Sequence, residues 1–200
     1  MSALSSPAAV RNRDPILAVL RACLPERGLV LEIASGAGEH AVHMAANLPG
    51  LTWRPTDSDP SARASIAAWA ERAGLPNLMA PLALDAADPA AWPVKRCDAV
   101  VCINMVHISP LEATKGMMRG AARILPKGGM VFVYGPFTVG GEHTAPSNAA
   151  FDADLKSRNP AWGVRDVGHV RAAGRAHHLV LAETIAMPAN NLSLVFRKVG

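Results

Sequence analysis

The sequence has few aromatic residues, few cysteines and no hydrophobic run long enough to cross a membrane. Aromatic side chains make up only 4% of its 200 residues, whereas alanine is abundant, a composition that suits helices packed closely on a sheet. Half of the residues are hydrophobic, which excludes an intrinsically disordered chain. We therefore expect one domain, covering residues 1–200, with a substantial core and no membrane partner.

The cysteines, histidines and serines lack the spacings of common metal-binding and catalytic motifs. Cys23, Cys97 and Cys102 form no CxxC pair, and the last two are expected to be small buried hydrophobic residues. The seven histidines do not pair with carboxylates at ligand spacings, so we expect no metal site. The absence of a GxSxG motif argues against a serine hydrolase. An odd number of cysteines, with no apolar signal-peptide segment near the N-terminus, predicts a cytoplasmic protein.

The excess of positive charge is small. The formal net charge is +4, and arginine and lysine are scattered rather than gathered in a basic run or interleaved with aromatic residues. This pattern is typical of a solvated surface and does not predict binding to nucleic acid. The sequence carries no signal for the oligomeric state.

Apolar runs and helix signals alternate over the first part of the chain. Strands are expected at residues 29–33, 51–55, 79–83, 99–103 and 130–134. Helices are expected at 15–24, 39–47, 60–73 and 110–125. Three of the helices begin with a predicted cap: Asp14-Pro15, Asp59-Pro60 and the capping box Ser109-Pro110-Leu111-Glu112. This alternation predicts an α/β fold, in which a mostly parallel sheet has helices on both faces.

The alternation breaks after residue 135. Residues 136–165 are rich in glycine, proline, histidine and asparagine, and only a short helix near 147–158 is expected there. Long irregular segments in compact domains are usually functional or disordered, so we interpret this one as a substrate-binding insertion. Two strand-like runs follow at 179–186 and 192–197, and the short turn between them predicts an antiparallel pair.

A glycine-rich segment, LEIASGAGEH at residues 31–40, ends the first predicted strand. Residues 36–41 match GxGxxA, a dinucleotide-binding pattern, but that match alone is weak. Glu32 lies just before the loop, where a carboxylate is poorly placed for a pyrophosphate and well placed for an ammonium group. The antiparallel pair at the end of the chain is also atypical of dinucleotide-dependent dehydrogenases. Both features point away from NAD.

Two further acids follow the next predicted strands. Asp57 is placed to accept hydrogen bonds from both hydroxyl groups of a ribose. The alternative is that Asp57 caps the following helix, although Asp59 before Pro60 suits that role better. Asp85 could accept a hydrogen bond from an adenine amino group, or it could only shape its turn. With Glu32 and the glycine loop, these acids indicate S-adenosylmethionine.

This order of motifs resembles the class I S-adenosylmethionine-dependent methyltransferases, whose Rossmann-like, mostly parallel sheet has seven strands and an antiparallel C-terminal strand. The segments RNRDPI, LEIASGAGEHAVHMA, CINMVHISP, YGPF, HTAPSNAAFD and MPANNLSLVFRK resemble one family within that class, a methyltransferase-like family of unassigned function. The resemblance implies S-adenosyl-L-methionine as cofactor, bound by Glu32, Ala34, Gly36, Gly38, Asp57, Asp85, Asn104 and Met105. His40 is expected close to it. Arg175, His177 and His178 depart from the family's pattern, and nothing in the sequence assigns them a function.

Residues after the fourth and fifth predicted strands should face the transferred methyl group, because ligands of open α/β sheets bind beyond the C-terminal ends of strands. His107 is the first candidate for a general base, since an unperturbed imidazole pKa of about 6.5 suits neutral pH. The alternative is a residue bonded to backbone near Ser109. His143 is the second candidate, and Tyr134 is expected to orient the substrate. The expected substrate-binding residues are Phe137, Ser147, Asn148, Phe151, Asn190 and Asn191.

Three functions are compatible with these features. The leading hypothesis is in-line methyl transfer to a small molecule, with an oxygen, nitrogen, sulfur or carbon nucleophile. The second is a protein that binds the same cofactor without transferring its methyl group, as a regulatory module. The third is an NAD-dependent oxidoreductase, which Glu32 and the antiparallel end of the sheet argue against.

Overall fold

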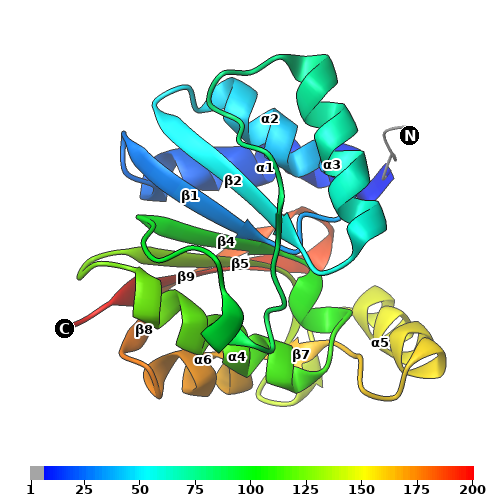
Figure 1. Cartoon of the computed structure of the whole chain (residues 1–200). Coiled ribbons are helices and arrows are strands. Elements are labelled where there is room, and N and C mark those ends of the chain that lie inside the picture. The colour runs from blue at the N-terminus through cyan, green and yellow to red at the C-terminus, as the bar shows by residue number, and fades with distance from the viewer. Residues whose placement is uncertain (1–6) are drawn as a thin grey trace.

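The computed structural model describes residues 7–200, and it contains one mixed sheet with helices on both faces (Figure 1). The main path of the sheet has the order β3-β2-β1-β4-β5-β9-β8, and the short strands β6 and β7 pair with β5. Strands β3 to β5 along this path are parallel, whereas β9 is antiparallel to both of its neighbours. The strands are β1 (Gly28–Ile33), β2 (Leu51–Asp57), β3 (Leu82–Ala83), β4 (Ala99–Ile103), β5 (Met130–Val139), β6 (Glu142–His143), β7 (Arg165–Asp166), β8 (Leu179–Met187) and β9 (Asn191–Lys198). The predicted fold class is confirmed, including the antiparallel pair at the C-terminus.

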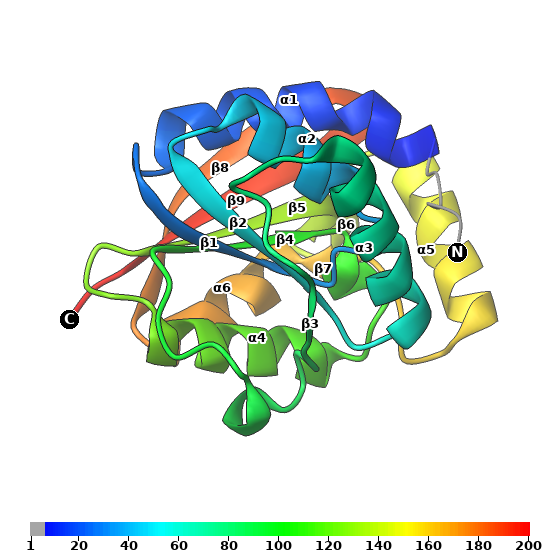
Figure 2. The same ribbon diagram turned by 45° about the horizontal axis from the view of Figure 1, so that its top comes forward.

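The helices form two layers. On one side of the sheet lie α1 (Pro7–Cys23), α2 (Glu39–Asn47) and α3 (Pro60–Ala73). On the other side lie α4 (Leu111–Ile124) and α6 (Val167–Arg175), next to each other (Figure 2). Helix α5 (Pro146–Arg158) stands apart, beyond the C-terminal ends of the parallel strands. Short 3₁₀ turns are η1 (Pro89–Ala91), η2 (Met105–His107) and η3 (Pro188–Asn190).

Alternation along the buried strands divides the core between the two layers. Val101 and Phe132 pack with α1 and α2, whereas Cys102 and Val133 pack with α4. Because side chains of a strand alternate between faces, Glu32 and Tyr134 project toward the side of α1 and α2. This division decides which residues can meet at the end of the sheet.

Two of the three predicted helix caps are wrong. Helix α1 begins at Pro7, so Pro15 lies inside it, and the Asp14 carboxylate lies 2.9 Å from Nε2 of His43. The capping box does not form either, because the Ser109 hydroxyl donates to the Met105 carbonyl (2.8 Å) and Pro110 precedes the helix. The third cap is confirmed, since the Asp59 carboxylate accepts a hydrogen bond from the Ser61 amide at 2.8 Å.

The region expected to be irregular contains more regular structure than predicted. Strand β5 continues to Val139 because β9, β6 and β7 supply partners along its length. Helix α6 was not predicted, since its two glycines lower helix propensity. Asp166, which caps that helix by accepting from the Gly168 amide (2.7 Å), was a usable signal. None of the helices within residues 7–200 combines the length and hydropathy required to cross a bilayer.

Candidate cofactor and substrate site

A sharp loop joins β1 to α2 at the C-terminal edge of the sheet. Ala34, Gly36 and Gly38 have left-handed backbones, with φ angles of 54°, 57° and 97°. A Cβ atom at Gly38 would lie 2.9 Å from the Ile66 Cα atom, so only glycine allows α3 to pack this closely. At Gly36 no heavy atom of residues 7–200, other than those of its chain neighbours, lies within 4 Å of the corresponding position. The loop thus packs tightly against α3 at one glycine and leaves the other open for a ligand.

This loop borders a small cavity, which we call the loop cavity, with a volume of 180 Å³. Helix α1 contributes Ala9 to its lining, β1 contributes Glu32, and the end of β4 with the segment that follows contributes Ile103, Asn104 and Ile108. Six predicted cofactor-binding residues line it together: Glu32, Ala34, Gly36, Gly38, His40 and Asn104. The volume is smaller than that of typical ligand pockets, about 300–1,000 Å³, so a nucleoside ligand would extend beyond it along the sheet edge.

Glu32 is the most unusual group in the lining, because its side chain is only 1% exposed. The Trp53 indole N–H donates to its carboxylate at 2.8 Å. Burial raises the pKa of Glu32 to about 7; the hydrogen bonds from Trp53 and Ser35 oppose this rise, and the charge of Asp57 adds to it. A buried carboxylate beside a cavity gains most from a ligand that brings a positive charge.

Asp57 holds the glycine loop in place. Its two carboxylate oxygens accept hydrogen bonds from the backbone amides of Gly36 and Asp59, each at 2.9 Å. It is not the cap of α3, which is Asp59. Ionised carboxylates can accept about four hydrogen bonds, so Asp57 retains capacity for a ribose. It does not line the loop cavity, however.

Asp85 and Met105 also lie outside the lining of the loop cavity. The Asp85 carboxylate accepts from the Ala87 amide at 2.8 Å, which matches the alternative interpretation of Asp85 as a turn residue. The Met105 side chain is buried, and its sulfur lies 3.2 Å from the Ser109 hydroxyl oxygen. Asn104, by contrast, lines the loop cavity. Its backbone is left-handed (φ 65°), and its backbone amide donates to the Tyr134 carbonyl at 2.8 Å.

Asn12 on α1 is a site residue that sequence reasoning missed. The Asn12 side-chain oxygen lies 2.8 Å from Nε2 of His40, and the same side chain is hydrogen-bonded to the Tyr134 phenol. Burial lowers the pKa of His40 to about 4, helped by the positive charges near it, so this imidazole is neutral at pH 7 and donates its Nε2 proton to Asn12. The segment RNRDPI contains Asn12 and resembles the family's pattern, but nothing in the sequence indicates which residues the Asn12 side chain contacts.

Replacing Asn12 with leucine should destabilise the protein by about 1–3 kcal/mol, because two buried polar partners lose their hydrogen bonds. Tyr134 is the only tyrosine in the chain, so ultraviolet titration reports its pKa directly. Burial already raises that pKa, and loss of the Asn12 bond should raise it further. Arg11→Ala, at an exposed neighbour on the same helix, is the matched control. Equal titration curves for the Asn12 and Arg11 variants would show that the bond to Tyr134 does not form.

His107 lies on the other side of the sheet from the loop cavity. Its buried ring packs edge to face on Phe137, with ring centroids 4.9 Å apart, and a Cβ atom at Gly135 would overlap its Nε2 atom. Nδ1 faces the Arg165 amide at 3.4 Å, and the His107 carbonyl accepts from the Gly163 amide at 3.0 Å. His107 does not line the loop cavity. Its role as a general base stays a prediction, and this placement favours the alternative, a residue bonded to neighbouring backbone.

We expect His107 to stay neutral well below pH 6, because burial lowers its pKa to about 3 and the nearby Arg165 adds to that effect. A pKa lower than in the unfolded chain means that the neutral form stabilises the fold. This stabilisation is complete above about pH 6.5 and is lost as the pH falls toward 3. Nitrogen-15 NMR of the imidazole measures the titration directly. A midpoint near 6.5 would contradict the buried placement and would restore His107 as a good proton acceptor.

Arg165, which sequence reasoning also missed, ties this region together. Its guanidinium donates to the backbone carbonyls of Val106 (3.0 Å), Ser109 (2.6 Å) and Ala161 (2.7 Å). These bonds connect η2 to the segment that follows α5. Because Val106 and Ser109 flank His107 in the chain, these bonds also hold His107 in its position against β5.

The other predicted substrate residues are dispersed over the insertion. The Asn148 side chain donates to the Asn190 carbonyl at 2.9 Å, so the turn before β9 lies against α5. Nε2 of His143 lies 3.4 Å from the Asp152 carboxylate on α5. Ser147 is exposed, and Asn191 hydrogen-bonds within its own turn.

Phe137 and Phe151, two of the expected substrate-binding residues, do not lie together. Phe137 is fully buried in the core beside His107, because β5 directs it toward α4 and α6. Phe151 is 39% exposed on α5. A substrate at the end of the sheet could reach Phe151 but not Phe137 without rearrangement of the core.

The strand order, the antiparallel β9 beside β5 and the glycine loop after β1 together define the fold of the class I methyltransferases. A family model described as a protein of unknown function (DUF938) matches residues 3–198. The chain belongs to this family.

Solved structures of methyltransferases share the fold at low sequence identity. An O-methyltransferase family protein from Burkholderia thailandensis is 16% identical with a TM-score of 0.81, over 96% of this chain and 58% of that one. The calicheamicin biosynthesis methyltransferase CalO1, bound to S-adenosylhomocysteine, is 16% identical with a TM-score of 0.77, over 96% and 55%. An O-methyltransferase family 2 protein from Planctomyces limnophilus, in complex with apigenin, is 18% identical with a TM-score of 0.74, over 96% and 65%. The chain thus spans little more than half the length of the first of these structures.

Proposed function

We propose that this protein binds S-adenosylmethionine at the loop cavity and transfers its methyl group to a small molecule. The observation that carries the proposal is the buried carboxylate of Glu32, which lines a cavity next to an open glycine loop. This cavity lies at the end of β1 and β4, the two neighbouring strands from which the strand order runs in opposite directions. In α/β sheets of this kind, ligands bind at that position. The bound structural neighbour CalO1 carries S-adenosylhomocysteine on the same fold, which supports the choice of ligand.

The residues present fit this cofactor. Glu32 would pair with the ammonium group of the methionine part, and Asp57 would accept the ribose hydroxyls while it holds the loop. Asp85, farther along the same edge, would meet the adenine. The remaining contacts would come from backbone near the open loop and from the segment after β4, namely Ala34, Gly36, Gly38, Asn104 and Met105, with His40 on the cavity wall. The cofactor supplies an electrophilic methyl group on a sulfonium centre.

The chain's own contribution to transfer would be alignment of the nucleophile and exclusion of water. Tyr134 is held by Asn12 on the same side of the sheet as Glu32, so it can orient a bound substrate. His143 and two exposed residues of α5, Ser147 and Phe151, would contact the substrate, since α5 stands beyond the C-terminal ends of the parallel strands. Asn190 and Asn191 would approach from the turn before β9, whose Asn190 carbonyl is bonded to Asn148 of α5. A small molecule suits this arrangement better than a macromolecule, because the loop cavity at this edge has a volume of only 180 Å³. Helices α1 and α5 lie at the same end of the sheet (Figure 2).

One observation favours a second function, a binding or regulatory module without transfer. Burial lowers the pKa of both His40 and His107, so neither imidazole is a strong proton acceptor. A nucleophile that must lose its proton would then need the exposed His143 or solvent.

Release of S-adenosylhomocysteine from S-adenosylmethionine, measured against pools of hydroxylated, amino and thiol metabolites, separates the two functions. The transferase predicts release with at least one pool, and slower release from a Glu32→Gln variant at limiting cofactor concentration. Saturable cofactor binding without release from any pool would favour the binding module.

A further inference from the structure

The outer face of α4 carries a row of one lysine and two arginines that have no part in the proposed function. Lys115, Arg119 and Arg123 lie four residues apart on α4, so they share one face of that helix. Lys115 is paired with Glu112 at 2.8 Å. Among residues 7–200, no carboxylate lies within ion-pair distance of Arg119 or Arg123. The row spans about 12 Å along the helix axis.

A groove runs beside this row, between α4 and α6. It consists of two adjoining hollows of 500 and 680 Å³, which share Arg119, Ala176 and His177. The floor is largely apolar and made of small side chains, because α6 contributes Ala172 and Ala173 and the residue that follows it is Ala176. A shallow apolar floor flanked by unpaired cations is complementary to an acidic amphipathic helix.

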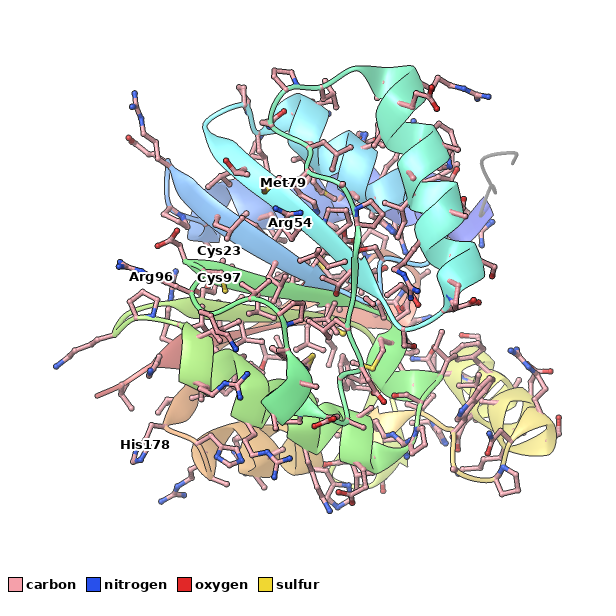
Figure 3. The ribbon with its side chains drawn as sticks, viewed as in Figure 1. Cys23, Arg54, Met79, Arg96, Cys97 and His178 are labelled. Carbon is pink, nitrogen blue, oxygen red and sulfur yellow. The ribbon has the colours of Figure 1, made fainter. Side chains whose placement is uncertain are left out.

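This groove lies away from the loop cavity. The loop cavity lies at the C-terminal ends of the parallel strands, whereas His178, which borders the groove, lies at the opposite end of the molecule from α5 (Figure 3). Two of the unexplained residues, His177 and His178, therefore belong to this groove and not to the proposed methyl-transfer site. Arg171 and Arg175 on α6 also have no carboxylate within ion-pair distance in the described part of the chain.

We propose that this groove is a docking site for an acidic amphipathic helix of a partner protein. Such a helix would place alanine-sized or leucine-sized side chains on the floor and carboxylates against Arg119 and Arg123. Acidic residues spaced four apart on the partner would match the spacing of the row on α4. The partner is recognised by charge and by a narrow apolar face.

The lining of the groove favours a protein helix over nucleic acid. No aromatic side chain of Phe, Tyr or Trp lines either hollow, so unstacked bases would find no stacking surface there. The apolar floor would remain unused by a polyphosphate chain.

The experiment measures fluorescence anisotropy at low salt with three labelled probes. The first is a helical peptide with glutamate at every fourth position and alanine and leucine on the adjoining face. The second has lysine in place of each glutamate, and the third is a single-stranded oligonucleotide of the same net charge as the first. The test variants are Arg119→Glu combined with Arg123→Glu, and Ala176→Gln, which narrows the floor without a change in charge. Arg27→Glu combined with Arg72→Glu, on exposed residues elsewhere, is the charge-matched control.

We expect the acidic peptide to bind the unaltered protein and the lysine peptide not to bind. The arginine pair should weaken binding by about ten-fold or more, and Ala176→Gln should weaken it as well, while the control pair should have little effect. Thermal unfolding and S-adenosylhomocysteine titration should be unchanged in all variants. Failure of the acidic peptide to bind, equal losses in the control pair, or tighter binding of the oligonucleotide would each overturn the proposal.

Discussion

Replacement of Glu32 with glutamine should weaken S-adenosylhomocysteine binding by about ten-fold or more, because a charge-assisted hydrogen bond contributes roughly 1.5–3 kcal/mol. Glutamine keeps the acceptor for the Trp53 indole, so the cavity wall should stay intact. Glu71→Gln, at an exposed position on α3, is the matched control. Calorimetric titration of both variants measures the effect. Unchanged affinity in Glu32→Gln would remove the carboxylate from the proposed ammonium site.

The same variant should be more stable than the unaltered protein at pH 8 in the absence of ligand. Burial raises the pKa of Glu32 from 4.5 to about 7, so its protonated form stabilises the fold. This stabilisation is complete below about pH 4.5 and is lost as the pH rises through 7, which corresponds to about 3 kcal/mol. Urea denaturation between pH 4.5 and 8 should show that slope in the unaltered protein and its loss in Glu32→Gln. A gain in binding at the expense of stability is typical of a functional residue.

Asp57→Ala is the second variant with a large expected effect. It removes the acceptor of the Gly36 and Asp59 amides, so the glycine loop should loosen, and it removes the proposed partner of the ribose. Affinity for S-adenosylhomocysteine should fall by about ten-fold or more, and stability should fall by about 1–3 kcal/mol. Asp57→Asn, which keeps one acceptor, should lose less of both.

Asp59→Ala is the matched control for Asp57. It should lower stability slightly through the lost cap of α3, with cofactor affinity nearly unchanged. Calorimetry and urea denaturation of the two variants separate the roles. If Asp59 controlled affinity and Asp57 only stability, the assignment of the ribose acid would be reversed.

Elements with strong local signals were predictable from the sequence. Helix α2 and strand β4 have the predicted bounds, because one follows a glycine loop and the other is a continuous apolar run. The cap at Asp59 was predicted because a cap followed by proline is a purely local signal. Strand β3 has only two residues, and the weak apolar pattern of residues 79–83 did not predict so short a strand.

The structure brings together the predicted site residues whose placement follows from chain direction, and it separates those whose placement depends on side-chain direction. Residues at the end of β1 and in the glycine loop meet in one cavity because parallel strands end at one edge. His107 and Phe137 follow strands of that same edge, yet they project into the layer of α4 and α6. Asn12 reaches the site from α1, a helix distant in sequence from its partners, and only tertiary packing brings the three together.

Titration calorimetry of the unaltered protein with S-adenosylhomocysteine, and separately with NAD, tests the central claim most directly. The loop cavity with its buried carboxylate predicts one saturable site for S-adenosylhomocysteine, with affinity that rises with pH as Glu32 ionises near pH 7. It predicts no saturable heat with NAD, whose pyrophosphate would face that carboxylate. Saturable NAD binding without any response to S-adenosylhomocysteine would contradict the assignment of the cofactor and of the proposed function with it.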